Sequence, residues 1–289
     1  MIEEFYIQSS FSEEAKLHVR IKSSGLSFNN PTILLHGRNL PPQYSYDFEL
    51  SGKSAADVLS QNDITCIMPT CLGFGKSTKL SENRYEDWYR DIKDVISFLE
   101  TTRGINKFNI VGWSSSSVPA LMIASRMPEK INSVIIYGIT KHYFVQGHVL
   151  EQKPFFFYNP DQLFFRRQKD IPADRKDEIS PPEWIEKLKN EVNKLLPLKV
   201  PNGLENDRVD IVKGNKLMTD FITWENIKCP VLFTTGEWDT DCDTEGLPEY
   251  AKKCNGEVFL CPEGTHWVLM EKNRGVMIEK FVNFIKGSK

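Results

Sequence analysis

The chain has 289 residues, which is enough for one large domain or for a core with an inserted subdomain. Its hydrophobic content of 40% and charged content of 26% are those of an ordinary globular protein, and a net charge of -3 gives no sign of binding to nucleic acid or to an anionic membrane. The sequence has no apolar run of about 18 residues and no signal-peptide pattern at its start, so we expect a cytoplasmic protein without a membrane span.

The first half of the chain alternates strand and helix patterns. Apolar alternation or short apolar runs predict strands at residues 4–10, 15–23, 31–37, 64–68, 107–112 and 131–137. Helical spacing of apolar residues predicts helices at 52–61, 85–103 and 115–126. This order predicts an α/β fold with a mostly parallel central sheet and helices on both faces.

The pattern breaks between about residues 138 and 225, where the composition becomes aromatic, charged and proline-rich. A structureless loop of this length would be unusual in a compact domain. We therefore predict an inserted helical cap at residues 139–225, with a helix at 183–196, between two core segments, 1–138 and 226–289. The core pattern resumes with strands at 230–236 and 256–261 and a closing helix at 274–286.

Six cysteines are scattered along the chain, with no CxxC pair and no metal-ligand spacing. Cys66, Cys229 and Cys261 lie in or beside apolar runs, where a free thiol behaves as a small hydrophobic side chain. We therefore expect reduced thiols, as in other cytoplasmic proteins.

The central chemical signal is Ser114, between an apolar strand and a helix. A serine on such a tight turn points its hydroxyl out of the sheet, at a helix N-terminus whose backbone N–H groups favour negative charge. Gly112 leaves room for the turn on one side, whereas Ser116 stands where the G-x-S-x-G pattern has its second glycine. Taken alone, the motif fits a nucleophile and a serine-rich helix cap equally well.

A serine hydroxyl needs a base to become a strong nucleophile. Among the five histidines, His266 lies in a loop between a strand and the last helix. Ligands of open α/β sheets bind at such strand ends, so His266 is the predicted general base. A carboxylate must orient this histidine, and Asp239 follows the strand at 230–236. Three nearby acids compete with Asp239 for this role: Glu237, Asp241 and Asp243.

His36 and Gly37 follow the first buried parallel strand. Glycine lets the backbone turn toward the serine, so the N–H groups of Arg38 and Ser115 are the predicted donors of an oxyanion hole. We expect His36 itself to be a buried structural histidine.

Five motifs in this order resemble the α/β-hydrolase superfamily, most closely its capped, single-domain esterase and lyase-like branch. They are His36-Gly37, Gly73-Phe74-Gly75-Lys76-Ser77, Gly112-Trp113-Ser114, Gly236-Glu237-Trp238-Asp239 and Gly264-Thr265-His266. The resemblance covers nearly the whole chain outside the insertion. It implies a Ser114-His266-Asp239 triad, an oxyanion donor after His-Gly, and a cap over the active site.

The chain departs from the family pattern at two positions. Thr70 stands where the family commonly has aspartate before the Gly-x-Gly-x-Ser turn, and Ser116 replaces a glycine. A serine rather than an aspartate nucleophile argues against haloalkane dehalogenase or epoxide hydrolase activity.

The leading hypothesis is hydrolysis of an ester, thioester or amide of a small, apolar substrate through an acyl-enzyme. It implies neither a metal nor an organic cofactor. Candidate substrate contacts are Trp113, Phe144 and Trp267. Two alternatives stay open: acyltransferase, cyclase or lyase chemistry with the same triad, and a non-catalytic small-molecule receptor on the same fold. The sequence also leaves open whether the chain forms a homo-oligomer.

Overall fold

The computed structural model describes residues 1–38, 40–80, 83–139, 169–193 and 221–288, together with the backbone of residues 155–157 and 199–201. Phe144, a predicted substrate contact, lies outside the described residues.

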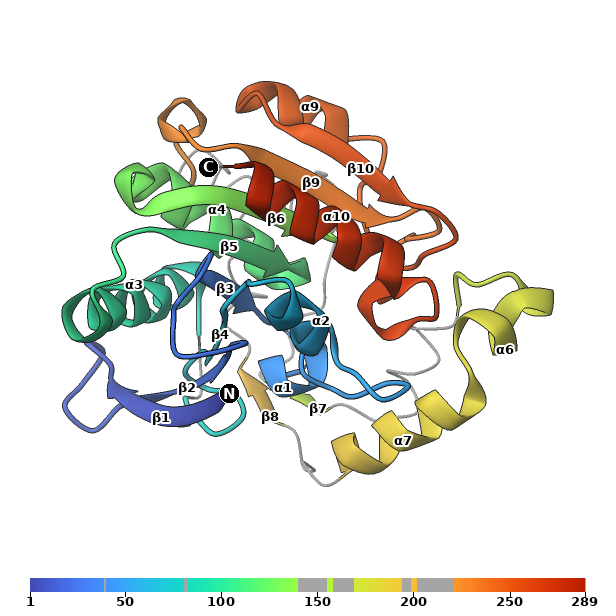
Figure 1. Cartoon of the computed structure of the whole chain (residues 1–289), viewed down its shortest axis with the longest axis horizontal. Helices are drawn as coiled ribbons and strands as arrows, with labels where there is room; N and C mark the ends of the chain where they lie inside the picture. The colour runs from blue at the N-terminus through green and yellow to red at the C-terminus, as the bar shows by residue number, and fades with distance from the viewer. Residues whose placement is uncertain are drawn as a thin grey trace.

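A central sheet organises the chain (Figure 1). Over the described ranges it has eight strands in the order β1-β2-β4-β3-β5-β6-β9-β10. Every neighbouring pair from β4 to β10 is parallel, whereas β2 is antiparallel to both β1 and β4. The strands are β1 Ile2–Gln8, β2 Lys16–Lys22, β3 Thr32–Leu35, β4 Cys66–Thr70, β5 Phe108–Trp113, β6 Ile131–Tyr137, β9 Val231–Gly236 and β10 Glu257–Cys261. The predicted mostly parallel sheet is confirmed.

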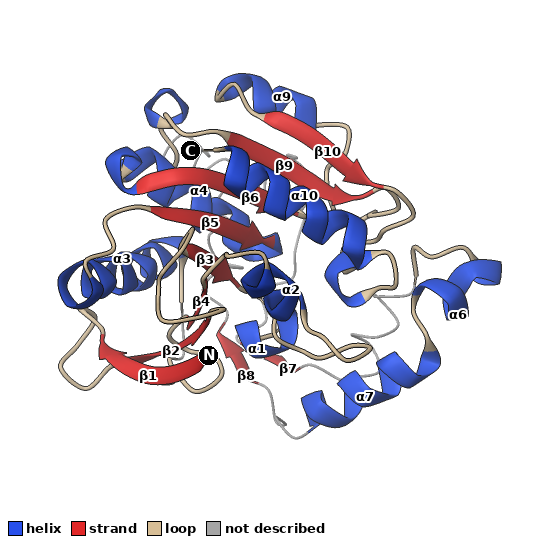
Figure 2. Ribbon diagram, viewed as in Figure 1, coloured by secondary structure: helices blue, strands red, loops and turns tan. Residues whose placement is uncertain are grey.

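Helices cover both faces of this sheet (Figure 2). Successive side chains of a strand point to opposite faces, so Ile33 and Leu35 of β3 join one hydrophobic cluster and Leu34 joins the other. The first cluster packs against α3 (Tyr85–Arg103), α4 (Ser117–Arg126) and α9 (Leu247–Lys253), and the second against α2 (Ala55–Gln61) and α10 (Arg274–Gly287). No helix in the described ranges is long and apolar enough to cross a membrane.

The helix boundaries follow from local capping. Helix α3 occupies the predicted residues and ends at Gly104, which adopts φ 67° in the left-handed region. Helix α2 begins later than the predicted Gly52, because Ser54 caps it. The Asp57 N–H donates to the Ser54 hydroxyl at 2.9 Å, and the Ser54 N–H donates to the Asp57 carboxylate at 2.8 Å.

Helix α9, between β9 and β10, is not evident in the sequence pattern. It spans only seven residues, about two turns, which is too short for a helical periodicity to stand out. Its apolar residues Leu247, Tyr250 and Ala251 are buried in the same cluster as the inner face of β9. Tertiary packing therefore supports this helix more than its own sequence does.

Strands β6 and β9 are neighbours in the sheet but are separated along the chain by a long segment, where the composition predicted a break in the pattern. Described elements of this segment are α6 Lys176–Ile179, α7 Pro182–Asn193, and two paired antiparallel strands, β7 Phe155–Phe157 and β8 Lys199–Pro201. Helix α7 begins one residue before the predicted start, and the predicted end at residue 196 lies outside the described residues. The segment therefore contains a strand pair as well as helix, which differs from the prediction of a helical insertion.

The strand order creates a natural site for ligands. Strand β3 lies between β4 and β5, so the chain leaves β3 toward one edge of the sheet and leaves β5 toward the other. Connections that diverge in this way open a crevice at the C-terminal ends of the two strands. The predicted oxyanion loop follows β3, and Ser114 follows β5.

Candidate active site

Ser114 occupies a strained turn between β5 and α4. Its φ is 55°, in the left-handed region that non-glycine residues rarely adopt, and its side chain is half-buried. Such a conformation costs on the order of 1–2 kcal/mol and persists only when surrounding contacts impose it. The strain marks Ser114 as a functional candidate independently of its motif.

Close packing at Gly112 allows this turn to form. A Cβ atom at residue 112 would lie 2.7 Å from the Cβ of Ala120 and 2.7 Å from the Ser116 carbonyl oxygen. Helix α4 therefore approaches β5 as closely as a glycine permits. Ser116, which replaces the second glycine of the motif, is fully buried, and its hydroxyl lies 3.0 Å from the Trp113 carbonyl oxygen. The turn thus accommodates a serine at this position.

His266 and Asp239 form a buried pair in the loops that follow β10 and β9. The Nδ1 atom of His266 lies 2.8 Å from Oδ2 of Asp239, and the two residues are 6% and 3% exposed. The carboxylate accepts a hydrogen bond, so Nδ1 carries the proton and Nε2 keeps a lone pair. This is the tautomer that a general base requires.

The structure distinguishes Asp239 from its acidic neighbours. The Asp239 Oδ1 atom accepts the backbone N–H groups of Asp241 at 2.9 Å and Cys242 at 3.0 Å, and Oδ2 also accepts the Thr235 hydroxyl. The side chain of Asp241 lies 3.1 Å from the Lys169 ammonium instead. Asp239 is therefore the acid that the fold directs at the histidine, and Thr235 is a partner that the sequence pattern gave no reason to single out.

The two loops are held together by a close backbone contact. A Cβ atom at residue 236 would lie 2.1 Å from the carbonyl group of Gly264, so a side chain at this position is sterically excluded. The Trp238 N–H donates to the Gly264 carbonyl oxygen at 2.8 Å. This contact explains the glycine that begins the Gly236 to Asp239 motif, while a Cβ atom at residue 264 would lie 2.8 Å from the Val268 side chain.

Two hydrogen bonds connect the histidine loop to β5 and β6. The His266 carbonyl oxygen accepts the Trp113 indole N–H at 3.1 Å and the Tyr137 hydroxyl at 2.9 Å. The rings of Trp113 and His266 lie 5.9 Å apart between centroids. The imidazole is therefore adjacent to the residue that precedes Ser114.

The loop after β3 lies directly against the serine turn. A Cβ atom at residue 37 would lie 3.5 Å from the Cβ of Ser114 and 3.2 Å from the Trp113 ring. Arg38 is the next residue after Gly37. Ser115, which is 4% exposed, is the second residue of the helical turn Ser114–Ser116. Both predicted oxyanion donors therefore belong to segments that flank the serine.

His36 is fully buried and has a different environment from His266. Its Nδ1 donates to the Gly37 carbonyl oxygen at 2.7 Å, and its Nε2 accepts the Cys71 N–H at 3.2 Å. Burial lowers the pKa of His36 to about 4, so the ring is neutral. Phe74 and Trp88 pack against it with ring centroids at 4.9 Å. The prediction of a buried structural histidine is confirmed.

The sequence matches the alpha/beta hydrolase fold family over residues 30–273. The chain belongs to this family. No curated protein gives a significant match to the sequence.

Solved structures of similar fold span the whole chain. A bromoperoxidase from Bacillus anthracis is 17% identical with a TM-score of 0.71, covering 98% of this chain and 100% of its own. A serine hydrolase from the polyaromatic hydrocarbon-degrading bacterium Cycloclasticus zankles is 14% identical (TM-score 0.65, 99% of both chains). A thermophilic esterase from Thermogutta terrifontis is 18% identical (TM-score 0.62, 99% of both chains). At these identities the likeness establishes the fold alone.

Within this hydrolase fold, the rings of Trp113 and Trp267 pack beside the imidazole of His266. They are 4% and 5% exposed, and their rings meet edge to face with centroids 5.0 Å apart. Trp113 also stacks on Tyr137 at 5.9 Å. These contacts bury both indoles beside His266, and their role as substrate contacts stays a prediction.

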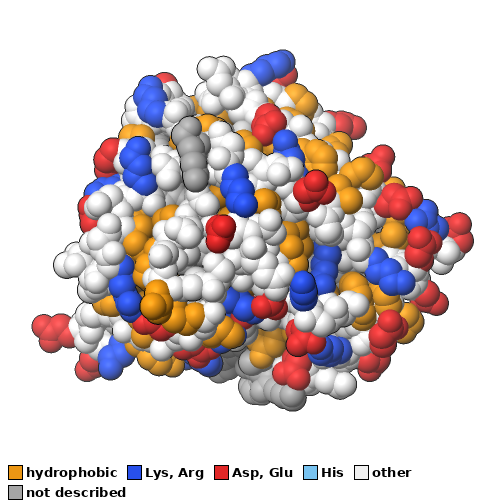
Figure 3. Space-filling view, in the orientation of Figure 1, with side chains coloured by type: hydrophobic (Ala, Val, Ile, Leu, Met, Phe, Trp, Pro, Cys, Tyr) orange, Lys and Arg blue, Asp and Glu red, His pale blue; other side chains and the backbone are white. Residues whose placement is uncertain are grey.

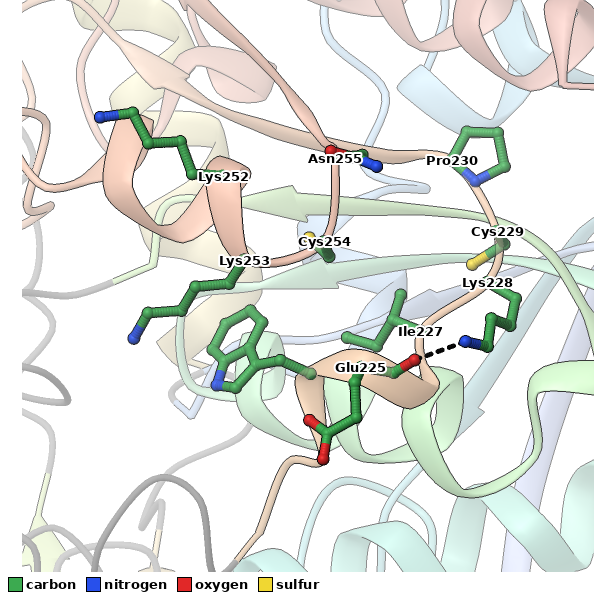
Figure 4. A pocket seen from close by; sticks show the side chains of 10 residues that line it. Glu225, Ile227, Lys228, Cys229, Pro230, Lys252, Lys253, Cys254 and Asn255 are labelled. Atoms are coloured by element: carbon green, nitrogen blue, oxygen red, sulfur yellow. Dashed lines mark hydrogen bonds between the residues drawn. The ribbon is translucent and has the colours of Figure 1, made fainter.

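A cavity of about 580 Å³ is lined by residues that precede β9 and by residues at the end of α9 (Figure 4). The thiols of Cys229 and Cys254 are part of its lining. Burial raises the pKa of each thiol to about 11, so both are protonated and poorly nucleophilic at neutral pH. The Lys228 ammonium donates to the Glu225 carbonyl oxygen at 2.6 Å. The two thiols therefore give this cavity no activated nucleophile.

No cluster of three or more histidine, cysteine or acidic side chains suited to a metal ion occurs in the parts of the chain that the structure describes.

Proposed function

We propose that the protein is a serine hydrolase that cleaves an ester, thioester or amide through an acyl-enzyme intermediate. One observation carries this proposal: the buried His266-Asp239 pair, joined at 2.8 Å, packs against Trp113, the residue that precedes a serine with φ 55° at the C-terminal end of β5. Because unrelated reactions share this fold, the site argues for the chemistry more strongly than the fold does.

In this mechanism the Ser114 oxygen attacks the substrate carbonyl carbon and transfers its proton to Nε2 of His266. Asp239 holds Nδ1 and stabilises the imidazolium that forms. The tetrahedral intermediate collapses when His266 returns the proton to the leaving group. A water molecule then attacks the acyl-enzyme by the same route and releases the acid and free Ser114.

The developing oxyanion needs donors, and the N–H groups of Arg38 and Ser115 are the candidates. The close packing at Gly37 supports the first of these, because a Cβ atom added there would lie 3.5 Å from the Cβ of Ser114. The position of Ser115 supports the second, because it directly follows Ser114 inside the helical turn Ser114–Ser116 that leads into α4.

Residues 139–225 are proposed to be a cap over this site, inserted between core segments 1–138 and 226–289. Described side chains of the segment contact both loops of the acid–base pair. Asp170 accepts the Thr240 hydroxyl at 2.6 Å, beside Asp239. Arg175 donates to both carboxylate oxygens of Glu263, three residues before His266, at 2.8 and 3.0 Å. The phenylalanine-rich composition of the segment, Phe144 included, supports a small apolar substrate.

Hydrolysis of p-nitrophenyl esters with acyl chains of two to about twelve carbons tests this function. Ser114→Ala is expected to lower kcat by about 10⁴-fold or more. Ser125→Ala is the matched control, because this buried serine in α4 donates only to the Met122 carbonyl oxygen at 3.1 Å. Full activity in Ser114→Ala would contradict the mechanism, and a folded wild type without any turnover would favour a ligand receptor.

A further inference from the structure

The last carbonyl group of β3 accepts hydrogen bonds from two buried hydroxyls. The Leu35 oxygen lies 2.8 Å from the Tyr46 hydroxyl and 3.1 Å from the Ser116 hydroxyl. Tyr46 is 1% exposed and Ser116 is fully buried. A carbonyl oxygen has two lone pairs, so both donors can bind it at once.

The two hydroxyls come from different segments of the chain. Tyr46 follows the short helix α1 (Pro42–Ser45), beyond the oxyanion loop, and burial raises the pKa of its phenol well above the usual value. The phenol is therefore always protonated and able to donate. Ser116 belongs to the turn at Ser114, and its single hydroxyl proton is shared between the Leu35 carbonyl oxygen and the Trp113 carbonyl oxygen at 3.0 Å.

These contacts connect the serine turn to the strand that carries the oxyanion loop. Leu35 pairs with Gly112 in the parallel ladder, and the Ser116 hydroxyl adds a bond across the ends of β3 and β5. The glycine that the family motif places at residue 116 could not make this bond. A second carbonyl group between Leu35 and Arg38 is also fixed, because the Nδ1 atom of His36 donates to the Gly37 carbonyl oxygen.

We propose that Tyr46 and Ser116 are positioning residues, which fix the direction of the Arg38 N–H toward the oxyanion by holding the Leu35 carbonyl. This inference rests on the proposed hydrolase function. Small displacements matter here, because the loop passes so close to the serine turn that a Cβ atom added at Gly37 would already touch Ser114 and the Trp113 ring. An oxyanion donor acts through its geometry, so a loop that shifts by a few tenths of an ångström loses transition-state stabilisation before it loses substrate binding.

The test compares Tyr46→Phe, Ser116→Ala and the double variant with wild type, using the best p-nitrophenyl ester and active sites titrated to completion with a fluorophosphonate. Each single variant is expected to lower kcat by about tenfold with KM unchanged within about twofold, and the double variant by about 100-fold. Ser117→Ala is the matched control, because its buried hydroxyl donates to the Gly112 carbonyl oxygen at 3.3 Å and does not reach β3. It should keep wild-type kcat.

Two matched inhibitors separate positioning from a general loss of structure. A trifluoromethyl ketone forms a tetrahedral oxyanion on the serine, whereas the corresponding methyl ketone binds mainly as a ground-state analogue. The Ki of the trifluoromethyl ketone should rise by the same factor as kcat falls, and that of the methyl ketone should not change. Tyr46→Phe keeps the ring and removes one oxygen, so it tests the idea even if Ser116→Ala fails to fold.

The outcomes are distinguishable from a failure of the proposed function. An active wild type with variants that match Ser117→Ala in kcat and in both Ki values would overturn the positioning role alone. An increase in KM without a fall in kcat would also overturn it. A folded wild type that neither hydrolyses esters nor reacts with the fluorophosphonate would refute the hydrolase function, and the positioning role with it.

Discussion

Two buried histidines lie in loops at the C-terminal edge of the sheet, and they differ in the hydrogen-bond partner of Nδ1. His36 bonds the Gly37 carbonyl through Nδ1 at 2.7 Å, whereas His266 bonds the Asp239 carboxylate through Nδ1 at 2.8 Å. The Nε2 atom of His36 is occupied by the Cys71 N–H. A carboxylate stabilises an imidazolium far better than a neutral carbonyl does. The charge of the partner, rather than burial, therefore distinguishes the candidate base from the structural histidine.

The largest expected effect comes from neutralising that partner. Asp239→Asn should lower kcat by about 10⁴-fold, because an amide favours the wrong imidazole tautomer and cannot stabilise its charge. Asp241→Asn is the matched control, since its side chain faces Lys169, and its kcat should stay within about threefold of wild type. Steady-state kinetics on a p-nitrophenyl ester measures both. Equal losses in the two variants would refute the assignment of Asp239.

His36→Gln tests the other histidine. The substitution removes a ring that packs on Phe74 and Trp88 and leaves polar groups without partners, so the free energy of unfolding should fall by about 2–3 kcal/mol. The value of kcat should fall by about tenfold or less, because only the oxyanion loop is disturbed. Urea unfolding and steady-state kinetics measure these quantities. A folded His36→Gln protein as inactive as a His266→Ala protein would contradict the contrast between the two residues.

A smaller effect is expected from the hydroxyl that supports the acid. Thr235→Val removes a donor to Asp239 Oδ2, which leaves the carboxylate less firmly oriented, and should lower kcat by about tenfold. Thr234→Val is the control on the same strand, because the buried Thr234 hydroxyl contacts the Met277 sulfur at 3.4 Å instead. If both substitutions change kcat equally, the hydroxyl has no specific role at the acid.

The smallest effect on activity is expected at Asp91, a buried carboxyl group that bonds the chain close to His36. It accepts the Leu72 N–H at 2.8 Å, next to the Cys71 N–H that bonds His36. Burial raises its pKa from 3.8 to about 7. Between about pH 4 and 7 the folded state keeps a proton that the unfolded state has released, so stability falls as the pH rises.

Relative to Asp91→Asn, the wild type should therefore lose about 2 kcal/mol of unfolding free energy between pH 5 and 8. The amide oxygen of asparagine can still accept the Leu72 N–H, so kcat should change little. Urea titrations of both proteins across this pH range measure the difference. Parallel stability curves would contradict a raised pKa at Asp91.

Much of this organisation could be predicted from the sequence. The apolar runs of β3, β4 and β5 are buried on both faces, so their strong patterns place the parallel core directly. His266 and Asp239 could be proposed as partners because each follows a predicted strand of the same sheet. The choice of Asp239 over Asp241 could not, because it depends on backbone N–H groups and on Thr235, which meet only in the folded loop.

Other features depend on contacts that a linear pattern does not contain. Helix α9 is too short to show a period, and β1 begins two residues before its predicted start because it pairs with β2 along Ile2 to Gln8. The role of Ser116 appears only when β3 and β5 are side by side. The predicted contact at Phe144 lies outside the described residues and stays a prediction.

Fluorophosphonate labelling tests the central claim most directly, with the modified residue located by mass spectrometry. Wild-type protein should be labelled on Ser114, and labelling should be lost in Ser114→Ala and in His266→Ala, because the probe reacts only with a serine activated by its base. Labelling at another residue, or unchanged labelling of His266→Ala, would contradict a nucleophile at Ser114 that is activated by His266.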